Sequence, residues 1–263
     1  MAVSIIVTGA AGRMGAILAR LVEEADDLNL AAVLERSEAV ARLAGWTAAG
    51  VFVTSDMRAA LAKCPGAVII DFTAPEATME NARAAAEAAS PIIIGTTGFS
   101  EEQIAELEAL AEKTLVFRSA NMSVGINVIM DILPKLTALL GEAYDIEMTE
   151  IHHNKKKDAP SGTALLLAEP LLKARGLSSA NVNTNRFDVR EPRKHDEIGI
   201  QSLRGGDVVG VHTVYYMGPG ERIELTHHAH SRENFANGAL RAARWINTQK
   251  PGRVYNMQDV LHS

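Results

Sequence analysis

The chain has 263 residues, of which 47% are apolar and 22% charged, with a formal net charge of −6. This composition is typical of a water-soluble globular protein, and the length suffices for one large domain or two modest ones. The acidic balance argues against a nucleic-acid partner, because a phosphate backbone calls for a basic surface. The single cysteine, Cys64, cannot form an internal disulfide, which favours the reducing cytoplasm.

The N-terminal residues run directly into an apolar segment, 3–7, without a basic region or a small-residue cleavage site. This pattern predicts a first strand and not a signal peptide. No apolar run approaches the roughly 20 residues that a membrane span requires, so we expect no membrane partner.

The first 120 residues alternate short β-branched runs with longer segments rich in Ala, Glu and Leu. We predict strands at 3–8, 30–35, 67–72, 92–95 and 115–118. Helices are predicted at 14–24, 75–89 and 100–113, the last of them opened by a capping box at Ser100. Short apolar strands that alternate with helices indicate a parallel sheet buried on both faces.

The pattern changes in the second half of the chain. A helix is predicted at 123–142, where Pro134 should kink or end it, and another at 163–175, distorted by Pro170. Between them, the segment 144–153 alternates as a strand does. One face of that strand carries Ile146, Met148, Glu150 and His152.

The C-terminal third predicts an antiparallel meander. Its strands are expected at 198–203, 208–217 and 222–228, joined by glycine-containing turns at 204–207 and 218–220. A final helix, capped by Ser231, should run to Asn247, and 178–185 is expected to be the most mobile loop. The first half of the chain predicts a parallel sheet and the second half an antiparallel one, so we predict two domains.

A glycine-rich turn, Thr-Gly-Ala-Ala-Gly-Arg-Met-Gly at 8–15, follows the first strand and opens the first helix. Glycines let the backbone approach a pyrophosphate, and the helix N-terminus supplies amide donors. Glu35 ends the second strand about 20 residues further on, where an acid receives the adenosine ribose. The alternative is a tight structural turn with an ordinary surface Glu-Arg pair. The order of strand, glycines, helix and acid favours a dinucleotide.

Arg36 follows Glu35 directly, and its guanidinium can pair with a 2′-phosphate or stack on the adenine. Glu35 favours NADH and Arg36 favours NADPH, so we predict weak discrimination between the two. Three further loops, 71–73, 95–99 and 119–122, follow later strands at the edge where open α/β sheets bind ligands. For Asp71 and Thr73, simple helix capping is an equally good interpretation.

The segment 147–164 combines two histidines, three lysines and a Pro-Ser-Gly-Thr turn. A strand that ends in His152 and His153 directs them to opposite sides, and Lys156 follows four residues after His152. The turn then opens a helix whose free amides and hydroxyls form an anion site.

This cluster has the groups that a hydride transfer to an imine dicarboxylate needs besides the dinucleotide. His152 can donate a proton, and Lys156 can protonate or steady the nitrogen. His153, Gly162 and Thr163 can hold carboxylate oxygens. The competing interpretations are a solvated basic loop and, less favoured, a zinc site. Because the helical His-x-x-x-His spacing is missing, we predict no metal.

Five segments together resemble the 4-hydroxy-tetrahydrodipicolinate reductase (dihydrodipicolinate reductase) family. They are Gly-Ala-Ala-Gly-Arg-Met-Gly at 9–15, Gly-Thr-Thr-Gly-Phe at 95–99, Asn121 with Ser-Val-Gly at 123–125, the histidine and Pro-Ser-Gly-Thr motif at 150–164, and Leu-Arg-Gly-Gly-Asp at 203–207 with Gly210 and His212. The resemblance covers nearly the whole chain in order.

The resemblance implies NADH- or NADPH-dependent reduction of a small dicarboxylate, 4-hydroxy-tetrahydrodipicolinate, to tetrahydrodipicolinate in diaminopimelate and lysine biosynthesis. It implies a cytoplasmic homotetramer assembled through the second domain's sheet. The fold it implies is α/β: a Rossmann-type parallel-sheet domain plus an α+β domain with a largely antiparallel or mixed open sheet. The dinucleotide-binding domain would comprise 1–122 with the C-terminal helix and tail 236–263, and the substrate-binding and oligomerisation domain 123–235.

The resemblance also implies roles for single residues. His152 and Lys156 match the proton donors, and His153, Gly162 and Thr163 match the substrate-binding residues. The positions that match the dinucleotide-binding residues are Gly9, Ala10, Ala11, Gly12, Arg13, Met14, Glu35, Arg36, Gly95, Thr96, Thr97, Ser119, Ala120, Asn121 and Met122.

Two other functions remain open. One is a different dehydrogenase of aspartate-derived metabolites, although semialdehyde chemistry needs a cysteine nucleophile and Cys64 lies away from the expected ligand edge. The other is a redox sensor that holds a dinucleotide without turnover. The pairing of His152 and Lys156 beside an anion turn argues against a sensor, which needs no proton donor there.

Overall fold

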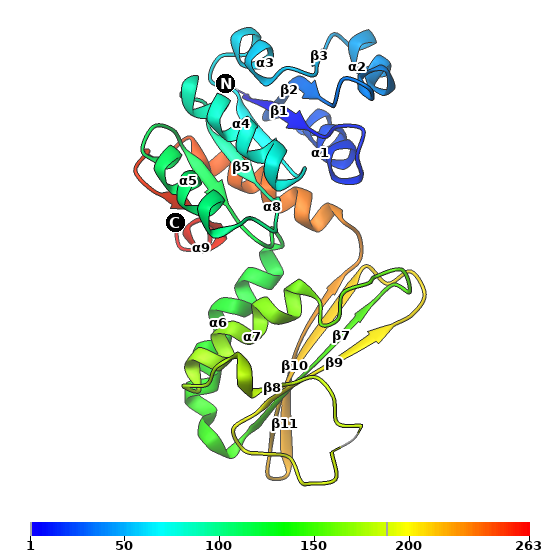
Figure 1. The fold of residues 1–263 in the computed structure, drawn as a ribbon, viewed down its shortest axis with the longest axis vertical. Helices are drawn as coiled ribbons and strands as arrows, with labels where there is room; N and C mark the ends of the chain where they lie inside the picture. The colour runs from blue at the N-terminus through cyan, green and yellow to red at the C-terminus, as the bar shows by residue number, and fades with distance from the viewer. Residues whose placement is uncertain (1, 188) are drawn as a thin grey trace. The chain divides into compact units, whose positions relative to one another are not determined.

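The computed structural model describes residues 2–187 and 189–263, which form two compact units (Figure 1). Unit 1 comprises Met1–Val124 and Arg232–Ser263, and unit 2 comprises Gly125–Ser231. The chain therefore leaves unit 1 after Val124 and returns to it at Arg232.

Unit 1 is built on a seven-stranded parallel sheet with the order β12-β6-β5-β4-β1-β2-β3. The strands are β1 (Val3–Thr8), β2 (Leu28–Leu34), β3 (Phe52–Thr54), β4 (Val68–Asp71), β5 (Ile92–Ile94), β6 (Val116–Arg118) and β12 (Val254–Tyr255). All residues of β4 and β5 are buried, as expected for the apolar central strands of a parallel sheet, and they include Asp71 at the end of β4. The predicted Rossmann-type parallel sheet is confirmed.

Helices cover both faces of this sheet (Figure 1). One core joins the sheet to α1 (Arg13–Glu23), α8 (Glu233–Ile246) and α9 (Met257–Leu261). The other joins it to α3 (Met57–Lys63), α4 (Pro75–Glu87) and α5 (Glu101–Ala111). The predicted capping box of α5 is confirmed, since the Ser100 and Gln103 side chains each accept from the other residue's backbone N–H.

Several elements of unit 1 were not predicted. The segment 40–63 contains the 3-10 helix η1 (Val40–Leu43), α2 (Ala44–Ala48), β3 and α3, which are too short to impose a clear period on the sequence. The predicted cap of α8 at Ser231 is wrong, because the helix begins at Glu233 and Arg232 occupies the N-cap position. A serine caps a helix only when it directly precedes the first helical residue.

Unit 2 contains a five-stranded mixed sheet with the order β11-β10-β7-β9-β8. The strands are β7 (Asp145–His152), β8 (Val182–Asn183), β9 (Ile198–Arg204), β10 (Gly210–Gly218) and β11 (Glu221–Ala229). The mixed sheet is confirmed. Of the predicted meander, the second hairpin is confirmed, since β10 pairs antiparallel with β11, but the first is wrong: β7 lies between β9 and β10 and pairs in parallel with β9. In its sequence, the turn after β9 looks like a hairpin turn. In the structure it crosses the end of β7, and the inner face of β7 is buried.

Two helices, α6 (Val124–Leu140) and α7 (Gly162–Ala174), pack with the sheet of unit 2 in one core. Both continue through an internal proline, so Pro134 does not end α6. Short 3-10 helices lie at Gly141–Ala143 (η2) and Ser179–Asn181 (η3), and the loop predicted at 178–185 contains η3 and β8.

The segment Val124–Ala143 is the one place where a described helix is long and apolar enough to cross a membrane, judged by length and composition. The expectation that no apolar run approaches this length is therefore wrong. A helix that packs in a protein core meets the same criterion, and α6 contributes Ile126 and Leu133 to the core of unit 2.

Candidate active site

The glycine-rich turn of unit 1 is a close backbone loop at the carboxyl end of β1. Gly9 has a φ of +61°, a conformation that favours glycine, and its carbonyl accepts a 2.8 Å hydrogen bond from Gly12 N–H. A Cβ on Gly15 would overlap the backbone of Gly9, so only glycine allows α1 to begin this close to the turn. At the N-cap of α1, Gly12 makes no side-chain cap hydrogen bond. This arrangement fits a pyrophosphate, which the amides of the first turn can bind.

Glu35 lies directly beside this turn. Its carboxylate accepts hydrogen bonds from Ala11 N–H (3.1 Å) and from Arg36 N–H (3.0 Å). The Arg36 side chain is 79% exposed and pairs with Glu38 at 3.4 Å. The structure thus brings the predicted acid to the turn and leaves the guanidinium of Arg36 at the surface.

The loops after β4 and β5 are joined by a buried carboxylate, Asp71. Its oxygens accept hydrogen bonds from the hydroxyls of Thr73, Thr78 and Thr96 at 2.7, 2.8 and 3.1 Å. Asn81 donates a further bond at 2.7 Å. The Thr96 hydroxyl is therefore engaged inside the fold, and only its backbone remains for a ligand, whereas Thr97 is exposed.

The loop after β6 shows a similar division. Ser119 Oγ donates to the carbonyl of Asn121 at 2.7 Å, and the Asn121 side chain accepts from Ser123 N–H at 2.8 Å. Ala120 is exposed, but Met122 is only 1% exposed and packs in the core of unit 1. Any contact of Met122 with a dinucleotide must therefore come from its backbone.

In unit 2, the side chains suited to catalysis lie at the end of β7. The residues of this strand alternate strictly between half-buried and buried. Glu150 and His152 lie on the buried face, as the sequence predicts, and are 0% and 8% exposed. His152 Nδ1 lies 2.6 Å from Glu150 Oε2. A strand with a period of two places these residues side by side because they are two positions apart.

Glu150 is surrounded by hydrogen-bond donors. Both terminal nitrogens of Arg204 contact it at 2.7 Å, and Ser161 N–H donates to Oε1 at 3.0 Å. Burial alone would raise the pKa of Glu150, but the bonds from Arg204, Ser202, His152 and Ser161 lower it to about 2. Glu150 is consequently an ionised carboxylate at neutral pH.

The electrostatics of His152 are a balance of opposing effects. Burial lowers the pKa of its imidazole, whereas the hydrogen bond and the charge of Glu150 raise it. The charges of Lys156 and Arg204 lower the pKa further, so the net shift is downward and the neutral imidazole predominates at neutral pH.

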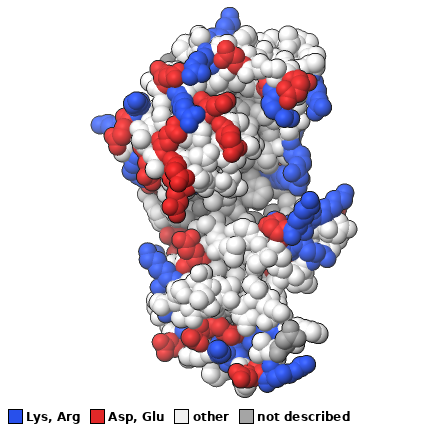
Figure 2. Space-filling view, in the orientation of Figure 1, with Lys and Arg blue, Asp and Glu red and all other residues white. Residues whose placement is uncertain are grey.

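The loop after β7 carries the other predicted residues. His153 N–H donates to the carbonyl of Val208 at 2.8 Å and Asn154 N–H to that of Gly206 at 3.2 Å, so the turn after β9 holds this loop. Lys156 Nζ pairs with Asp158 at 2.8 Å, and its side chain is 21% exposed. Figure 2 shows Lys and Arg side chains gathered at this end of the sheet.

The helix α7 begins at the Pro-Ser-Gly-Thr turn. Ser161 is its N-cap, with Oγ accepting from Ala164 N–H at 3.1 Å, so Gly162 and Thr163 form the first turn. The same oxygen lies 3.0 Å from Nε2 of His212, a residue 4% exposed whose pKa burial lowers to about 4. His212 packs edge-on against His152, with ring centroids 5.1 Å apart.

Glu150 and Ser161 belong to this site although no sequence motif selected them as site residues, and Arg204 was noted only as part of the segment 203–207. Glu150 could have been found, because a period of two places it beside His152 on an otherwise apolar strand face. The contact of Arg204 could not, because it depends on the pairing of β9 with β7.

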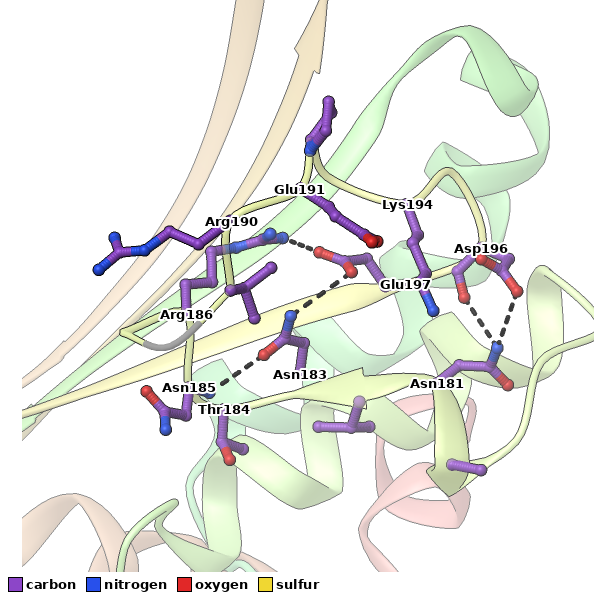
Figure 3. Close-up of a pocket in the computed structure, with 14 residues that line it drawn as sticks. Asn181, Asn183, Thr184, Asn185, Arg186, Arg190, Glu191, Lys194, Asp196 and Glu197 are labelled. Atoms are coloured by element: carbon purple, nitrogen blue, oxygen red, sulfur yellow. Dashed lines mark hydrogen bonds and ion pairs between the residues drawn. The ribbon is translucent and has the colours of Figure 1, made fainter.

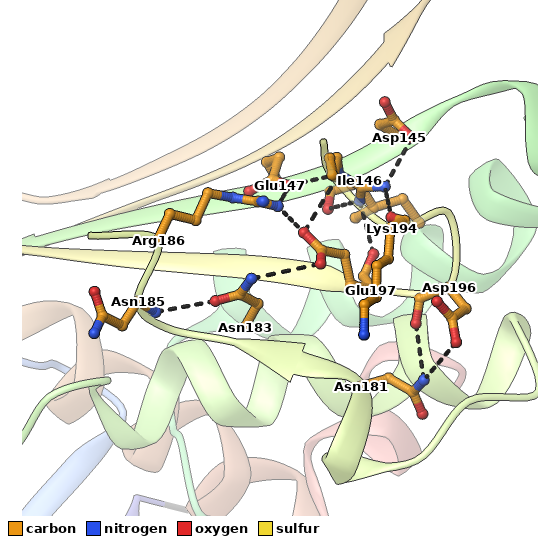
Figure 4. Close-up of polar contacts among 11 residues, drawn as sticks. Asp145, Ile146, Glu147, Asn181, Asn183, Asn185, Arg186, Lys194, Asp196 and Glu197 are labelled. Carbon is orange, nitrogen blue, oxygen red and sulfur yellow. Dashed lines mark hydrogen bonds and ion pairs between the residues drawn. The ribbon is translucent and has the colours of Figure 1, made fainter. Parts of the chain in front are cut away.

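A cavity of about 950 Å³ in unit 2 lies elsewhere, and its lining includes none of the predicted site residues (Figure 3). Its polar side chains largely contact one another: Arg186 pairs with Glu197, and Asn181 donates to Asp196 (Figure 4). Arg193 ties the same loop to β7 through Asp145 and Glu147, both at 2.8 Å. This network holds the loop before β9 in place, and we assign the chemistry to the end of β7.

The comparisons agree on one family. The family model described as dihydrodipicolinate reductase, N-terminus, matches residues 3–122, and that described as dihydrodipicolinate reductase, C-terminus, matches 125–261. Proteins named 4-hydroxy-tetrahydrodipicolinate reductase are 57% identical in Nitratidesulfovibrio vulgaris and 48% identical in Lawsonia intracellularis. Each alignment covers 99% of this chain and 100% of the relative.

Solved structures share the fold. A dipicolinate-bound dihydrodipicolinate reductase from Paenisporosarcina sp. TG-14 matches with a TM-score of 0.78 and 23% identity, over 97% of this chain and 98% of that one. A scyllo-inositol dehydrogenase from Lactobacillus casei with bound NAD(H) matches with a TM-score of 0.58 and 14% identity, over 99% and 93% of the two chains. With both family models matched and a relative more than half identical over its full length, the chain belongs to the dihydrodipicolinate reductase family of nicotinamide-dependent oxidoreductases.

Proposed function

We propose that the protein reduces 4-hydroxy-tetrahydrodipicolinate to tetrahydrodipicolinate, with NADH or NADPH as reductant, in diaminopimelate and lysine biosynthesis. The names of its relatives support this substrate. The observation that carries the proposal is the buried Glu150–His152 pair, which adjoins Lys156 and the first turn of α7. The overall reaction consumes one hydride and one proton and releases water.

Unit 2 has the groups to hold a dicarboxylate. The amides of Gly162 and Thr163 lie in the first turn of α7, at the positive end of the helix dipole, which favours an anion. His153 adds a hydrogen-bonding side chain, and Lys156 adds positive charge and donors. Opposite charge near the site lowers the cost of bringing two carboxylates out of water.

His152 and Lys156 are the proposed proton donors. A lowered pKa makes the imidazolium of His152 a stronger acid, and the ammonium of Lys156 can protonate or steady the ring nitrogen. A bound nicotinamide would supply the hydride.

For the dinucleotide, we propose the glycine turn 9–14 as the pyrophosphate site, with Glu35 at the ribose and Arg36 at a 2′-phosphate. The loops 95–97 and 119–122 would line the nicotinamide end. Their side chains at Thr96 and Met122 are engaged or buried, so we assign these two residues backbone contacts.

We further propose a cytoplasmic homotetramer assembled through the sheet of unit 2. The face of this sheet away from α6 and α7 is polar and half-exposed, with Leu203 and Met217 among its exposed apolar residues. Analytical ultracentrifugation of the full chain tests the tetramer, and a monomer at micromolar concentration would contradict it.

Steady-state oxidation of NADH and of NADPH, measured with and without the cyclic substrate, tests the proposed function. The proposal expects oxidation that depends on the substrate and falls about 10²–10⁴-fold in His152→Gln, while dinucleotide binding persists. The exposed His195→Gln is the matched control, expected to keep full turnover. Binding of the dinucleotide without turnover would favour a sensor, and full turnover in His152→Gln would remove His152 from the chemistry.

A further inference from the structure

We propose that Glu150 is a positioning residue for the reaction: its carboxylate holds the Nδ1–H tautomer of His152, so that Nε2 is the nitrogen that exchanges the proton. This inference rests on the proposed role of His152 as proton donor. It assigns a task to a buried carboxylate that does not itself contact the substrate.

The hydrogen bonds determine the tautomer. Glu150 Oε1 accepts from Ser161 N–H and from one nitrogen of Arg204, and Oε2 lies against the other nitrogen of Arg204 and His152 Nδ1. An ionised carboxylate only accepts hydrogen bonds, so the proton in the 2.6 Å contact must belong to Nδ1. In the neutral ring, Nε2 then carries the lone pair.

The surroundings of Nε2 support its use. A Cβ built on Gly210 would lie 3.0 Å from His152 Nε2, tighter than ordinary van der Waals contact, so the glycine on the neighbouring strand β10 keeps a side chain from crowding this nitrogen. The imidazole of His212 packs against that of His152 in a T-shaped arrangement, with ring centroids 5.1 Å apart. The charged or titratable groups that face His152 are Glu150, Lys156, Arg204 and His212.

A glutamine cannot replace this carboxylate. Five donors converge on its two oxygens, because the Ser202 side chain adds to the contacts from His152, Ser161 and the two Arg204 nitrogens, and an amide has one oxygen and two N–H donors of its own. If the amide nitrogen faces His152, it donates to Nδ1 and selects the opposite tautomer. If it faces Ser161, a backbone N–H and Arg204 lose their acceptor.

The alternative is that Glu150 only stabilises the sheet through Arg204. Glu147 provides the matched control, because it lies on the same strand and also pairs with arginines, Arg186 and Arg193, but contacts no histidine. Glu147→Gln therefore removes a carboxylate–arginine pair of the same kind without touching His152.

The first measurement needs no substrate. We expect ¹⁵N NMR of His152, assigned by comparison with His152→Gln, to show the Nδ1–H tautomer at neutral pH in the wild type and in Glu147→Gln. In Glu150→Gln the Nε2–H tautomer should appear, and the pKa of His152 should fall further because the carboxylate that raises it is gone. A wild-type ring protonated at Nε2 would overturn the proposal, whatever the enzyme's activity.

The second measurement is a double-mutant cycle on turnover. Glu150→Gln should lower kcat about 10²-fold with KM changed less than threefold, and Glu150→Asp should recover part of the loss. In the His152→Gln background, Glu150→Gln should cost little more, because both act through one imidazole. Additive losses would overturn the proposal, as would wild-type kcat in folded Glu150→Gln.

These outcomes are distinguishable from failure of the proposed function. If His152→Gln retains turnover, His152 is not the proton donor, yet the tautomer measurement still decides what Glu150 does to the ring. Circular dichroism verifies folding of each variant. Should Glu150→Gln not fold, the wild-type tautomer and Glu150→Asp still decide the proposal, because Asp keeps the charge but shifts the oxygens away from Nδ1.

Discussion

Lys156 Nζ lies 2.8 Å from Oδ2 of Asp158, two residues further along the same loop. The backbone carbonyl of Asp158 in turn accepts a 2.7 Å hydrogen bond from Arg204, which also holds Glu150. The proposed proton donor is thus tied to the same arginine as the proposed positioning residue. This relationship makes the loop 153–160 part of the site and not a freely solvated basic segment.

Lys156→Met should lower kcat about 10²–10⁴-fold, because the proposed reaction loses a proton donor and a cation beside the substrate nitrogen. Lys155→Met is the control, since Lys155 is exposed and adjacent in the sequence. Steady-state kinetics of both variants with the cyclic substrate checks the prediction. Equal losses in the two would show that only the overall positive charge of the loop matters.

Gly15→Ala should weaken dinucleotide binding at least tenfold and destabilise unit 1, because the new Cβ overlaps the backbone of Gly9. Gly45→Ala, in α2, meets no atom within 4 Å and should be neutral or slightly stabilising, by up to about 1 kcal/mol. Calorimetric titration with NADH and urea unfolding measure the two effects. Unchanged affinity in Gly15→Ala would argue that the turn is purely structural.

Arg36→Ala should raise the KM for NADPH about tenfold and leave the KM for NADH nearly unchanged, since its exposed guanidinium is proposed to meet a 2′-phosphate. The wild type should use both dinucleotides with values of kcat/KM within about tenfold of each other. Arg42→Ala, another exposed arginine of unit 1, is the control. Parallel changes for both dinucleotides would exclude a phosphate-specific role.

The free energy of unfolding should fall as the pH is lowered from 6.5 towards 4. Burial lowers the pKa of His212 to about 4 in the folded protein, whereas a histidine in the unfolded chain has its ordinary pKa of 6.5. The unfolded chain therefore binds more protons than the folded protein in this pH window. The two pKa values differ by about 2.5, which corresponds to roughly 3–4 kcal/mol at about 1.4 kcal/mol per pKa unit. The lowered pKa values of His152 and His227 act in the same direction.

Urea unfolding at pH 7, 5.5 and 4.5 measures this dependence. His212→Gln should flatten it, whereas the exposed His195→Gln should not. Glu150 contributes in a separate pH range. Its pKa of about 2 in the folded protein lies below the ordinary glutamate pKa of 4.5, so its stabilisation is complete above pH 4.5 and is lost as the pH falls below that value. A pH dependence in His212→Gln equal to that of the wild type would contradict the assignment.

Local sequence patterns were enough to predict the parallel sheet of unit 1, the turn at Gly9–Gly15 and the buried face of β7. These features depend on local causes: apolar runs buried on both faces, glycines where the backbone turns tightly, and a period of two along a strand. His152 and Lys156 could be selected for the same reason, because their spacing and the turn that follows are visible in the sequence.

The pairing of β7 and the surroundings of His152 that follow from it could be seen only in the folded chain. In the sequence, the turn at 204–207 looks like a hairpin turn between β9 and β10. In the structure β7 lies between these two strands, because the inner face of β7, with Ile146 and Met148, is buried in the core of unit 2. That pairing brings Arg204 from β9 and Gly210 from β10 to the Glu150–His152 pair. Such contacts join residues about 50 positions apart, and no local period in a single sequence encodes them.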